Sequence, residues 1–167
     1  MNAPKITDTI AINFWNQFSL NRTVNRDFYK NVSEDKYDYR MVDTPKRKSN
    51  SVRESLAHQI DVQKCYMDGI KTKVLRFVSK NSLDPKKFFK KELLQKLDET
   101  DKELIVILSD PEISNKKVKV PWSKDPLSAV ATLWGLDSHE TLHTGWNIAI
   151  MDHLNMKRFS SLKEMWA

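Results

Sequence analysis

The chain contains only three glycines and six prolines among its 167 residues. Sandwiches, barrels and nucleotide-binding folds depend on many tight or glycine-rich turns, so this scarcity argues against them and favours long helices. A chain of this length can bury a sizeable core without disulfides or a structural metal. We therefore expect residues 1–167 to form a single, mostly helical domain.

Two stretches in the first half space their apolar positions by three and four residues, which indicates amphipathic helices. The first runs from about Thr7 to Asn31, and Thr7 or Asp8 is expected to cap it. The second follows Ser51, which with Glu54 forms a capping-box sequence, and contains one glycine. The first stripe consists of Ile6, Ile10, Phe14, Phe18, Asn21, Asn25 and Phe28. The second consists of Val52, Leu56, Gln59, Gln63, Tyr66, Ile70, Val74 and Phe77.

Two more helices are expected in the second half. After a break at residues 81–85, Asp84 and Pro85 supply the cap and first residue of a helix that reaches about Ser109. Asp-Pro recurs at residues 125–126, before a helix over residues 127–155. The third stripe consists of Phe89, Leu93, Leu97, Leu104, Ile107 and Leu108. The fourth is broad, as in a helix buried among several partners, and consists of Leu127, Val130, Ala131, Trp134, Leu136, Leu142, Trp146, Ile148, Ile150 and Leu154.

The segments between these helices indicate how the helices are connected. Residues 32–50 are polar and loop-like, with a short helical turn near Ser33–Lys36. Within residues 111–125, the alternating Lys117–Val120 segment predicts an extended loop or a short hairpin. Four helices of this length with one long crossover make a four-helix bundle. The predicted class is therefore all-α, with a short extended segment before the last helix.

The net charge is +6, and the basic excess lies in residues 1–100. Part of it falls in two short clusters, residues 45–48 and residues 86–91. Nucleic-acid binding is one interpretation of such clusters. A solvated basic surface is the favoured interpretation, because the clusters are short and no nucleic-acid-binding motif surrounds them.

Cysteine content and hydropathy bear on the compartment. Cys65 is the only cysteine, so the chain holds no internal disulfide and no cysteine-rich zinc site. No run of 18 or more apolar residues predicts a membrane span, and the first 20 residues lack the apolar core of a secretory signal. The expected location is the cytoplasm.

The histidines carry the main chemical signal. His139 and His143 are four residues apart, which on an α-helix means about 40° of rotation and about 6 Å of rise. Both imidazoles therefore project from one face and can bind one ion. His153 lies about 15 Å further along the same helix, too far for that ion, and is expected at the surface or in a partner contact.

A third ligand has to come from another helix, and His58 in the second helix is the remaining histidine. Three neutral imidazoles with a position left for water would bind Zn²⁺, Ni²⁺, Fe²⁺ or Mn²⁺, and the ligand type does not decide among these ions. The alternative is structural, because histidines four apart occur by chance on helices and a single histidine among apolar neighbours is often a hydrogen-bonded core residue.

Over nearly its whole length the chain resembles the DinB/YfiT-like family of metal-dependent enzymes. Three segments carry the resemblance: Arg53–His58, Val118–Trp122, and His139–Gly145 with the apolar stretch to His153. It implies a metal triad of His58, His139 and His143. Many members have Arg-Gly-Gln after the second histidine of the pair, where this chain has Thr144, Gly145 and Trp146, so the pocket shape and partner contacts differ.

The resemblance also implies a reaction class, since members of known activity are similar to low-molecular-weight-thiol S-transferases or thiol-dependent isomerases. The first hypothesis is therefore an enzyme in which a metal-bound thiolate attacks a small electrophilic substrate. Glu54, Asp61 or Tyr66 could orient a ligand imidazole or accept a proton. Cys65 is expected to be a small buried side chain.

Two further hypotheses remain open. A non-catalytic metal-binding protein would use the ion for stability or sensing, with Trp146, His153 and Trp166 in a partner surface. A nucleic-acid-associated protein would use the basic first 100 residues and bind with a steep salt dependence. Trp15, outside the core stripe of the first helix, allows a homodimer.

Overall fold

The computed structural model describes residues 5–77 and 83–165, and this part of the chain is mostly helical. The predicted all-α class is confirmed at this level. The α-helices are α1 (Thr9–Asn31), α2 (Val52–Thr72), α3 (Lys90–Leu108), α4 (Ala129–His153) and α5 (Ser160–Met165). Three 3₁₀ helices, η1 (Glu34–Lys36), η2 (Pro85–Lys87) and η3 (Ile113–Asn115), and two short strands, β1 (Lys117–Val118) and β2 (Leu127–Ser128), complete these elements.

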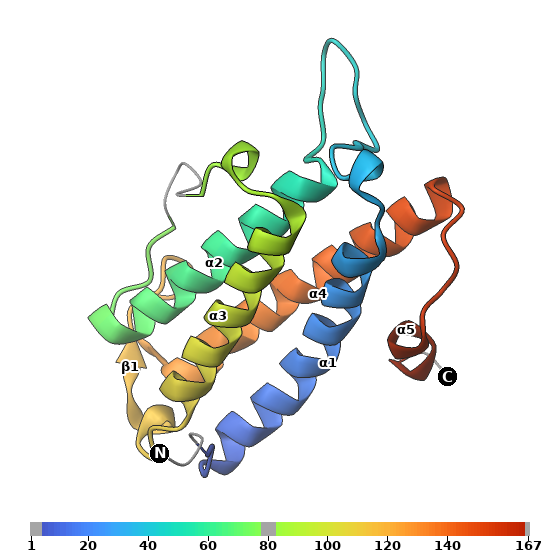
Figure 1. Cartoon of the computed structure of the whole chain (residues 1–167). Helices are drawn as coiled ribbons and strands as arrows, with labels where there is room; N and C mark the ends of the chain where they lie inside the picture. Colours follow the sequence, from blue (N-terminus) through green and yellow to red (C-terminus); the bar gives the residue numbers. More distant parts are fainter. Residues whose placement is uncertain (1–4, 78–82, 166–167) are drawn as a thin grey trace.

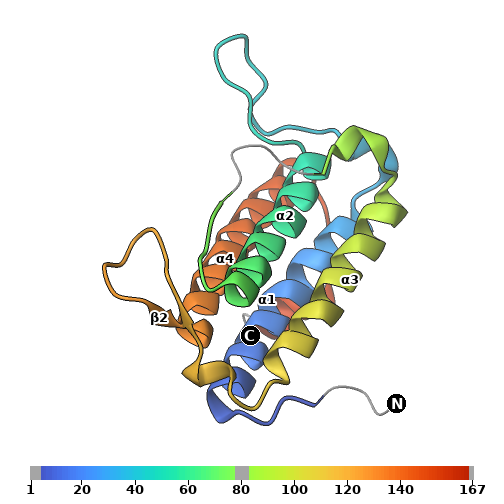
Figure 2. The same ribbon diagram turned by 90° about the vertical axis from the view of Figure 1, so that its left-hand side faces the viewer.

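The four long helices lie side by side, with α1 packed chiefly on α4 and α2 packed on both α3 and α4 (Figures 1 and 2). The connection over residues 32–50 forms a long loop that projects from one end of the helices (Figure 1). At the other end β1 pairs antiparallel with β2, with Lys117 opposite Ser128, which confirms a short hairpin before α4. The loop that joins the two strands also projects from the helices (Figure 2).

The starts of α1 and α2 follow the predicted capping chemistry. The carboxylate of Asp8 accepts a hydrogen bond from the Ala11 backbone N–H at 2.8 Å. At α2 the Ser51 hydroxyl accepts from the Glu54 N–H at 3.2 Å, and the Glu54 carboxylate accepts from the Ser51 N–H at 2.9 Å. The expected capping box is therefore present, and it sets where α2 begins.

The end of α2 differs from the prediction, because Val74 and Phe77 lie outside the helix. Lys73 adopts a left-handed conformation with φ of 64° and ends α2. The chain then pairs with the segment after β1, where the Leu75 N–H donates to the Lys119 carbonyl at 2.8 Å. The spacing of apolar residues predicted that the helix would continue past Thr72, but the residues that follow form this extended pairing instead. The predicted break at residues 81–85 lies partly outside the described residues.

Both Asp-Pro signals were assigned to the wrong element. Asp84 and Pro85 begin the short 3₁₀ helix η2, and α3 starts five residues after Pro85, at Lys90. Pro126 precedes β2, and the cap of α4 is Ser128, whose hydroxyl accepts from the Ala131 N–H at 3.1 Å. Proline fixes its own φ at a value that suits the first residue of any turn or helix, so an Asp-Pro pair marks where a turn starts. It does not specify whether that turn continues into a long helix.

Several predicted core positions are exposed. Ile10 is 56% exposed, because Ala11 takes the buried position and a one-residue step turns a side chain by about 100°. Phe89 is 76% exposed because it precedes α3 instead of lying on its apolar face. Leu142 is 74% exposed, since it lies two residues, or about 200°, beyond the buried Glu140. Trp134 is 39% exposed and touches Phe14 edge to face.

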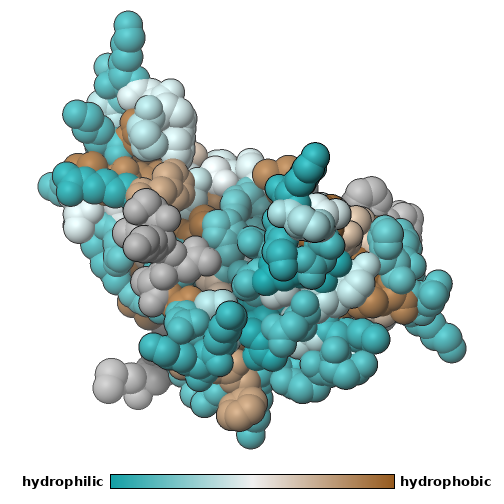
Figure 3. Space-filling view, turned by 90° about the horizontal axis from the view of Figure 1, so that it is seen from above, coloured by the Kyte–Doolittle hydropathy of each residue, from teal (hydrophilic) through white to brown (hydrophobic). Residues whose placement is uncertain are grey.

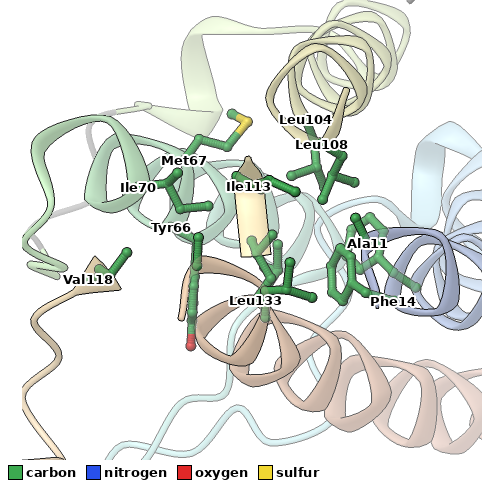
Figure 4. Close-up of a cluster of buried hydrophobic side chains, with 14 of the residues drawn as sticks. Ala11, Phe14, Tyr66, Met67, Ile70, Leu104, Leu108, Ile113, Val118 and Leu133 are labelled. Carbon is green, nitrogen blue, oxygen red and sulfur yellow. The ribbon is translucent and has the colours of Figure 1, made fainter. Parts of the chain in front are cut away.

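The apolar core consists of two clusters separated by a polar layer. The first cluster lies near the hairpin and includes Ala11, Phe14, Phe18, Tyr66, Met67, Ile70, Leu104, Leu108 and Leu133 (Figure 4). The second includes Phe28, Tyr29, Tyr37, Leu56, Ile60, Leu93, Leu97 and Ile150. Between them lie the buried polar residues Asn21, Arg22, Asn25, Gln59, Gln63 and Glu140. Splitting the core in this way requires each buried polar group to find a partner inside the protein.

Arg22 connects all four long helices within this polar layer. Its guanidinium contacts Glu140 of α4 at 3.2 Å and Asp101 of α3 at 3.3 Å. It also donates hydrogen bonds to the side-chain oxygens of Gln59 and Gln63 on α2. These contacts are directional, so they restrict how each helix can rotate or slide against α1.

Polar side chains dominate one face of the molecule. The face in Figure 3 is mostly hydrophilic, with small, separated hydrophobic groups. No helix in the described ranges is long and apolar enough to cross a membrane. The short helix α5, which no periodic pattern predicted, lies against α1 with Leu162 buried.

Candidate metal centre

Three histidine rings meet between α2 and α4. His58, His139 and His143 each offer one ring nitrogen, and these three atoms lie within 4.8 Å of one another. The Nε2 atoms of His58 and His139 are 3.1 Å apart. The ring centroids are 5.0 Å apart for His58 and His139, 5.6 Å for His58 and His143, and 4.6 Å for the pair on α4. The prediction that rings from two different helices come together is confirmed.

Polar contacts on the other side of α4 help to set the direction of the two histidines on that helix. The Asn25 side-chain amide donates to the Glu140 carboxylate at 2.8 Å, and Asn21 donates to Asp137 at 2.9 Å. Glu140 follows His139 by one residue, so the two side chains diverge by about 100°. With Glu140 held towards α1, His139 is turned towards α2.

The environment of the α4 histidines favours neutral imidazoles. Burial, with the neighbouring His58 and Arg22 adding to it, lowers the pKa of His139 to about 4. Burial and the other two histidines lower the pKa of His143 to about 3. Both rings are therefore uncharged at neutral pH, and only a neutral imidazole has a lone pair with which to bind a metal ion.

The separation of the ring nitrogens fits a metal ligand set. Imidazole nitrogens bind Zn²⁺ at about 2.0–2.1 Å, so two ligand nitrogens on one tetrahedral ion are about 3.4 Å apart. The 3.1 Å separation of the His58 and His139 Nε2 atoms is close to this value. Without an ion, the same separation allows one of these nitrogens to donate a hydrogen bond to the other.

A cavity of about 410 Å³ reaches all three rings from one side. Its other lining residues are Ser49, Asn50, Ser55, Leu142 and Trp146. Three of these could have been inferred, because Ser55 precedes His58 by three residues, and Leu142 and Trp146 follow the α4 histidines by three. Ser49 and Asn50 come from the loop before α2, and no periodic signal indicated them.

The other singled-out residues have different surroundings. The Glu54 carboxylate binds Arg40 at 2.5 Å and caps α2, and the Arg40 hydrogen bond lowers the pKa of Glu54. This arrangement does not support a role for Glu54 in orienting a ligand imidazole. Asp61 accepts a hydrogen bond from the Leu83 N–H at 3.2 Å. Cys65, which was expected to be buried, is only half-buried. His153 is exposed at the end of α4, as predicted for a residue outside the site.

The tryptophans expected in partner surfaces lie in different surroundings. Trp146 lines the cavity beside the histidines, and Trp166 lies outside the described residues. Trp15 is half-buried, packs against the first core cluster and contacts Phe18 at a centroid distance of 6.0 Å. The homodimer therefore stays a prediction.

The sequence matches no protein-family model and no curated protein. The resemblance to the DinB/YfiT-like family accordingly stays a prediction that rests on the three segments quoted above.

Proposed function

We propose that this chain is a divalent-metal-dependent enzyme with a DinB/YfiT-like four-helix bundle, in which His58, His139 and His143 bind one ion. The observation that carries the proposal is the convergence of three imidazoles from α2 and α4, with ligand atoms within 4.8 Å. Chance pairs of histidines on one helix are common, so the third ring, which comes from a neighbouring helix, is what supports a shared ligand role.

The identity of the ion follows only in part from the ligands. Three neutral nitrogen donors suit Zn²⁺, Ni²⁺, Fe²⁺ or Mn²⁺, and they suit Ca²⁺ and Mg²⁺ poorly because these ions prefer oxygen. The neutral state of His139 and His143 and the 3.1 Å separation of the His58 and His139 Nε2 atoms support a ligand role.

A low-molecular-weight thiol is the reactant that we propose for this site. A bound divalent ion with an open position would supply a Lewis acid that holds a thiol as its thiolate. Around that position, Asn50 and Ser55 offer hydrogen bonds to polar substrate atoms, while Leu142 and Trp146 form apolar walls. The cavity volume of about 410 Å³ is that of a small-molecule site.

A non-catalytic metal-binding protein is the second candidate. It is supported by the position of the ligands on α2 and α4, because one ion would cross-link two helices and stabilise the fold. Under this alternative, removing the metal lowers thermal stability but abolishes no reaction.

Elemental analysis of protein purified without a histidine tag tests the metal site. We expect close to one transition-metal ion per chain, lost in His58→Ala, His139→Ala and His143→Ala. The matched control is His153→Ala, which removes an exposed histidine from the same helix and should keep the metal. Equal metal content in all four variants, or no metal in the unmodified chain after incubation with each of the four ions, would contradict the site.

Turnover separates the two candidates. Metal-loaded protein is assayed with a panel of small thiols and electrophiles, and thiol transfer should disappear in the triple histidine-to-alanine variant. Metal binding without turnover of any thiol would favour the non-catalytic alternative.

A further inference from the structure

A second cavity lies beside the histidine cluster, on a side different from the first. It has a volume of about 290 Å³ and shares two of its lining residues, His58 and His139, with the first cavity. Its remaining walls come from α2 and the segment after it, and they include Val62, Cys65, Tyr66 and Phe77. Both cavities therefore border the same two histidines, one from α2 and one from α4.

Tyr66 is the unusual residue in this cavity. Only 4% of it is exposed, and its ring packs in the first core cluster and meets Phe77 edge to face at 5.7 Å. Its hydroxyl hydrogen-bonds to no described residue and points away from the aliphatic side chains of that cluster (Figure 4). A tyrosine hydroxyl that opens into a cavity can hydrogen-bond to a bound molecule, while its ring supplies an apolar wall.

Gly135 places this hydroxyl close to the histidines. A Cβ at Gly135 would lie 2.7 Å from the Tyr66 hydroxyl oxygen, so the absence of a side chain there makes room for the phenol. Gly135 precedes His139 by four residues, which is about 6 Å along α4. The hydroxyl thus lies about one helical turn from His139, a distance that one aromatic ring and a short substituent can span.

The walls of the second cavity select for an apolar ring. Val62, Cys65 and the faces of Tyr66 and Phe77 are apolar, and Phe77 also stacks on Trp122 at a centroid distance of 6.3 Å. Asp61, the acidic group in the wall, accepts a backbone hydrogen bond from Leu83. A cavity of about 150 Å³ is enough for benzene, so about 290 Å³ accommodates one ring with substituents.

We propose that the second cavity binds a small aromatic compound with a hydrogen-bond-accepting oxygen, and that the Tyr66 hydroxyl donates to that oxygen. This inference rests on the proposed function, because it assigns the aromatic compound as the electrophilic reactant of the proposed thiol transfer. The binding of the ring and its oxygen is a property of the cavity and can be measured with or without metal.

Binding of 4-fluoroacetophenone to the full chain, followed by ¹⁹F NMR, tests this assignment. The comparison ligand is 1-ethyl-4-fluorobenzene, which has the same ring and a similar shape but no oxygen. We expect Tyr66→Phe to weaken binding of the ketone by about fivefold, the effect of one hydrogen bond, and to leave the ethyl compound unchanged. Tyr37→Phe is the matched control, because it removes a tyrosine hydroxyl in the second core cluster, outside this cavity, and it should change neither ligand.

Cys65 provides an independent readout, since it is the only cysteine and lines this cavity. Saturating ketone should slow alkylation of Cys65 by iodoacetamide at least threefold in the unmodified chain. Gly135→Ala, which crowds the Tyr66 hydroxyl, should reduce this protection, with circular dichroism used to verify that the variant is folded. Absence of ketone binding, or equal ketone affinity in Tyr66→Phe and the unmodified chain, would overturn the assignment.

The metal content of the same samples separates this inference from the proposed function. If the chain binds metal but not the ketone, the proposed ligand of the second cavity is wrong and the metal site stands. A chain that binds the ketone through Tyr66 but no metal supports the cavity and overturns the proposed enzyme.

Discussion

Replacing Arg22 with methionine should destabilise the protein strongly, although Arg22 lies outside both cavities. The substitution keeps a long apolar chain but removes the charge that faces Glu140, whose side chain is 1% exposed. Removing one partner of a buried ion pair typically costs about 3–5 kcal/mol, because the remaining charge stays buried without compensation. Hydrogen bonds to Gln59 and Gln63 are lost as well. At about 2–4 °C of Tm per kcal/mol for a domain of this size, we expect a decrease in Tm of roughly 6–20 °C.

The next arginine on α1 is the matched control. Arg26 pairs with Asp98 at 2.5 Å, but the two side chains are 45% and 32% exposed. Pairs exposed to this degree contribute about 0–1 kcal/mol, so Arg26→Met should cost less than about 1 kcal/mol. Urea unfolding followed by circular dichroism and tryptophan fluorescence measures both free energies of unfolding. Equal losses for the two variants would refute the reasoning from burial.

A second substitution tests the cause. If the loss in Arg22→Met comes from an uncompensated carboxylate, adding Glu140→Gln should recover about half of it in the double variant.

The pH dependence of stability gives an independent check on the role of the Glu140 carboxylate. Burial raises the pKa of Glu140 and Arg22 opposes that shift, so without Arg22 the carboxyl is protonated more easily. The stability difference between Arg22→Met and the unmodified chain should therefore narrow as the pH falls from 7 to 5, and a constant difference would point to lost packing instead.

Three further predictions concern the histidines and the start of α2. The pKa values of His139 and His143 are lowered to about 4 and about 3, so as the pH falls the unfolded chain binds protons before the folded chain does. Metal-free protein should therefore lose stability as the pH falls from about 6.5 towards 4, which urea unfolding measures. Ser51→Ala should cost about 1 kcal/mol in the same assay, through loss of the helix cap. Added Zn²⁺ should raise the Tm of the unmodified chain and of His153→Ala, but not of His58→Ala, in differential scanning calorimetry.

The number and order of the long helices could be predicted from the sequence, because α1, α2 and α3 each bury one side and the apolar residues of α4 form a broad stripe. The ends of the helices were less predictable. Lys73 ends α2 through a left-handed conformation that no glycine announces, and Ser128 caps α4 two residues after the proline that was expected to start it. In both places the chain forms extended pairing, of residues 74–75 with Lys119 or of Leu127 with Val118, and local propensity does not contain that information.

The candidate site was predictable to the extent that it depends on one helix. The spacing of His139 and His143 placed both rings on one side, and elimination suggested His58. The position of the Tyr66 hydroxyl was not predictable, because it depends on how α2 packs against Gly135 of α4. Contacts between helices are set by tertiary packing, so the two cavities could not be derived from the sequence pattern.

The segment His139-Glu-Thr-Leu-His143-Thr explains why hydropathy was a poor guide to α4. Glu140 and Thr144 are four residues apart and buried on one side of the helix, and His139 and His143 have the same spacing on a side turned about 100° from it. One side binds polar groups of α1 and the other meets His58, so α4 uses polar residues on two sides that both face the interior. The contacts of Glu140 restrict rotation of the turn that carries both histidines. The buried polar layer therefore helps to set the orientation of His139 and His143 in the candidate metal centre.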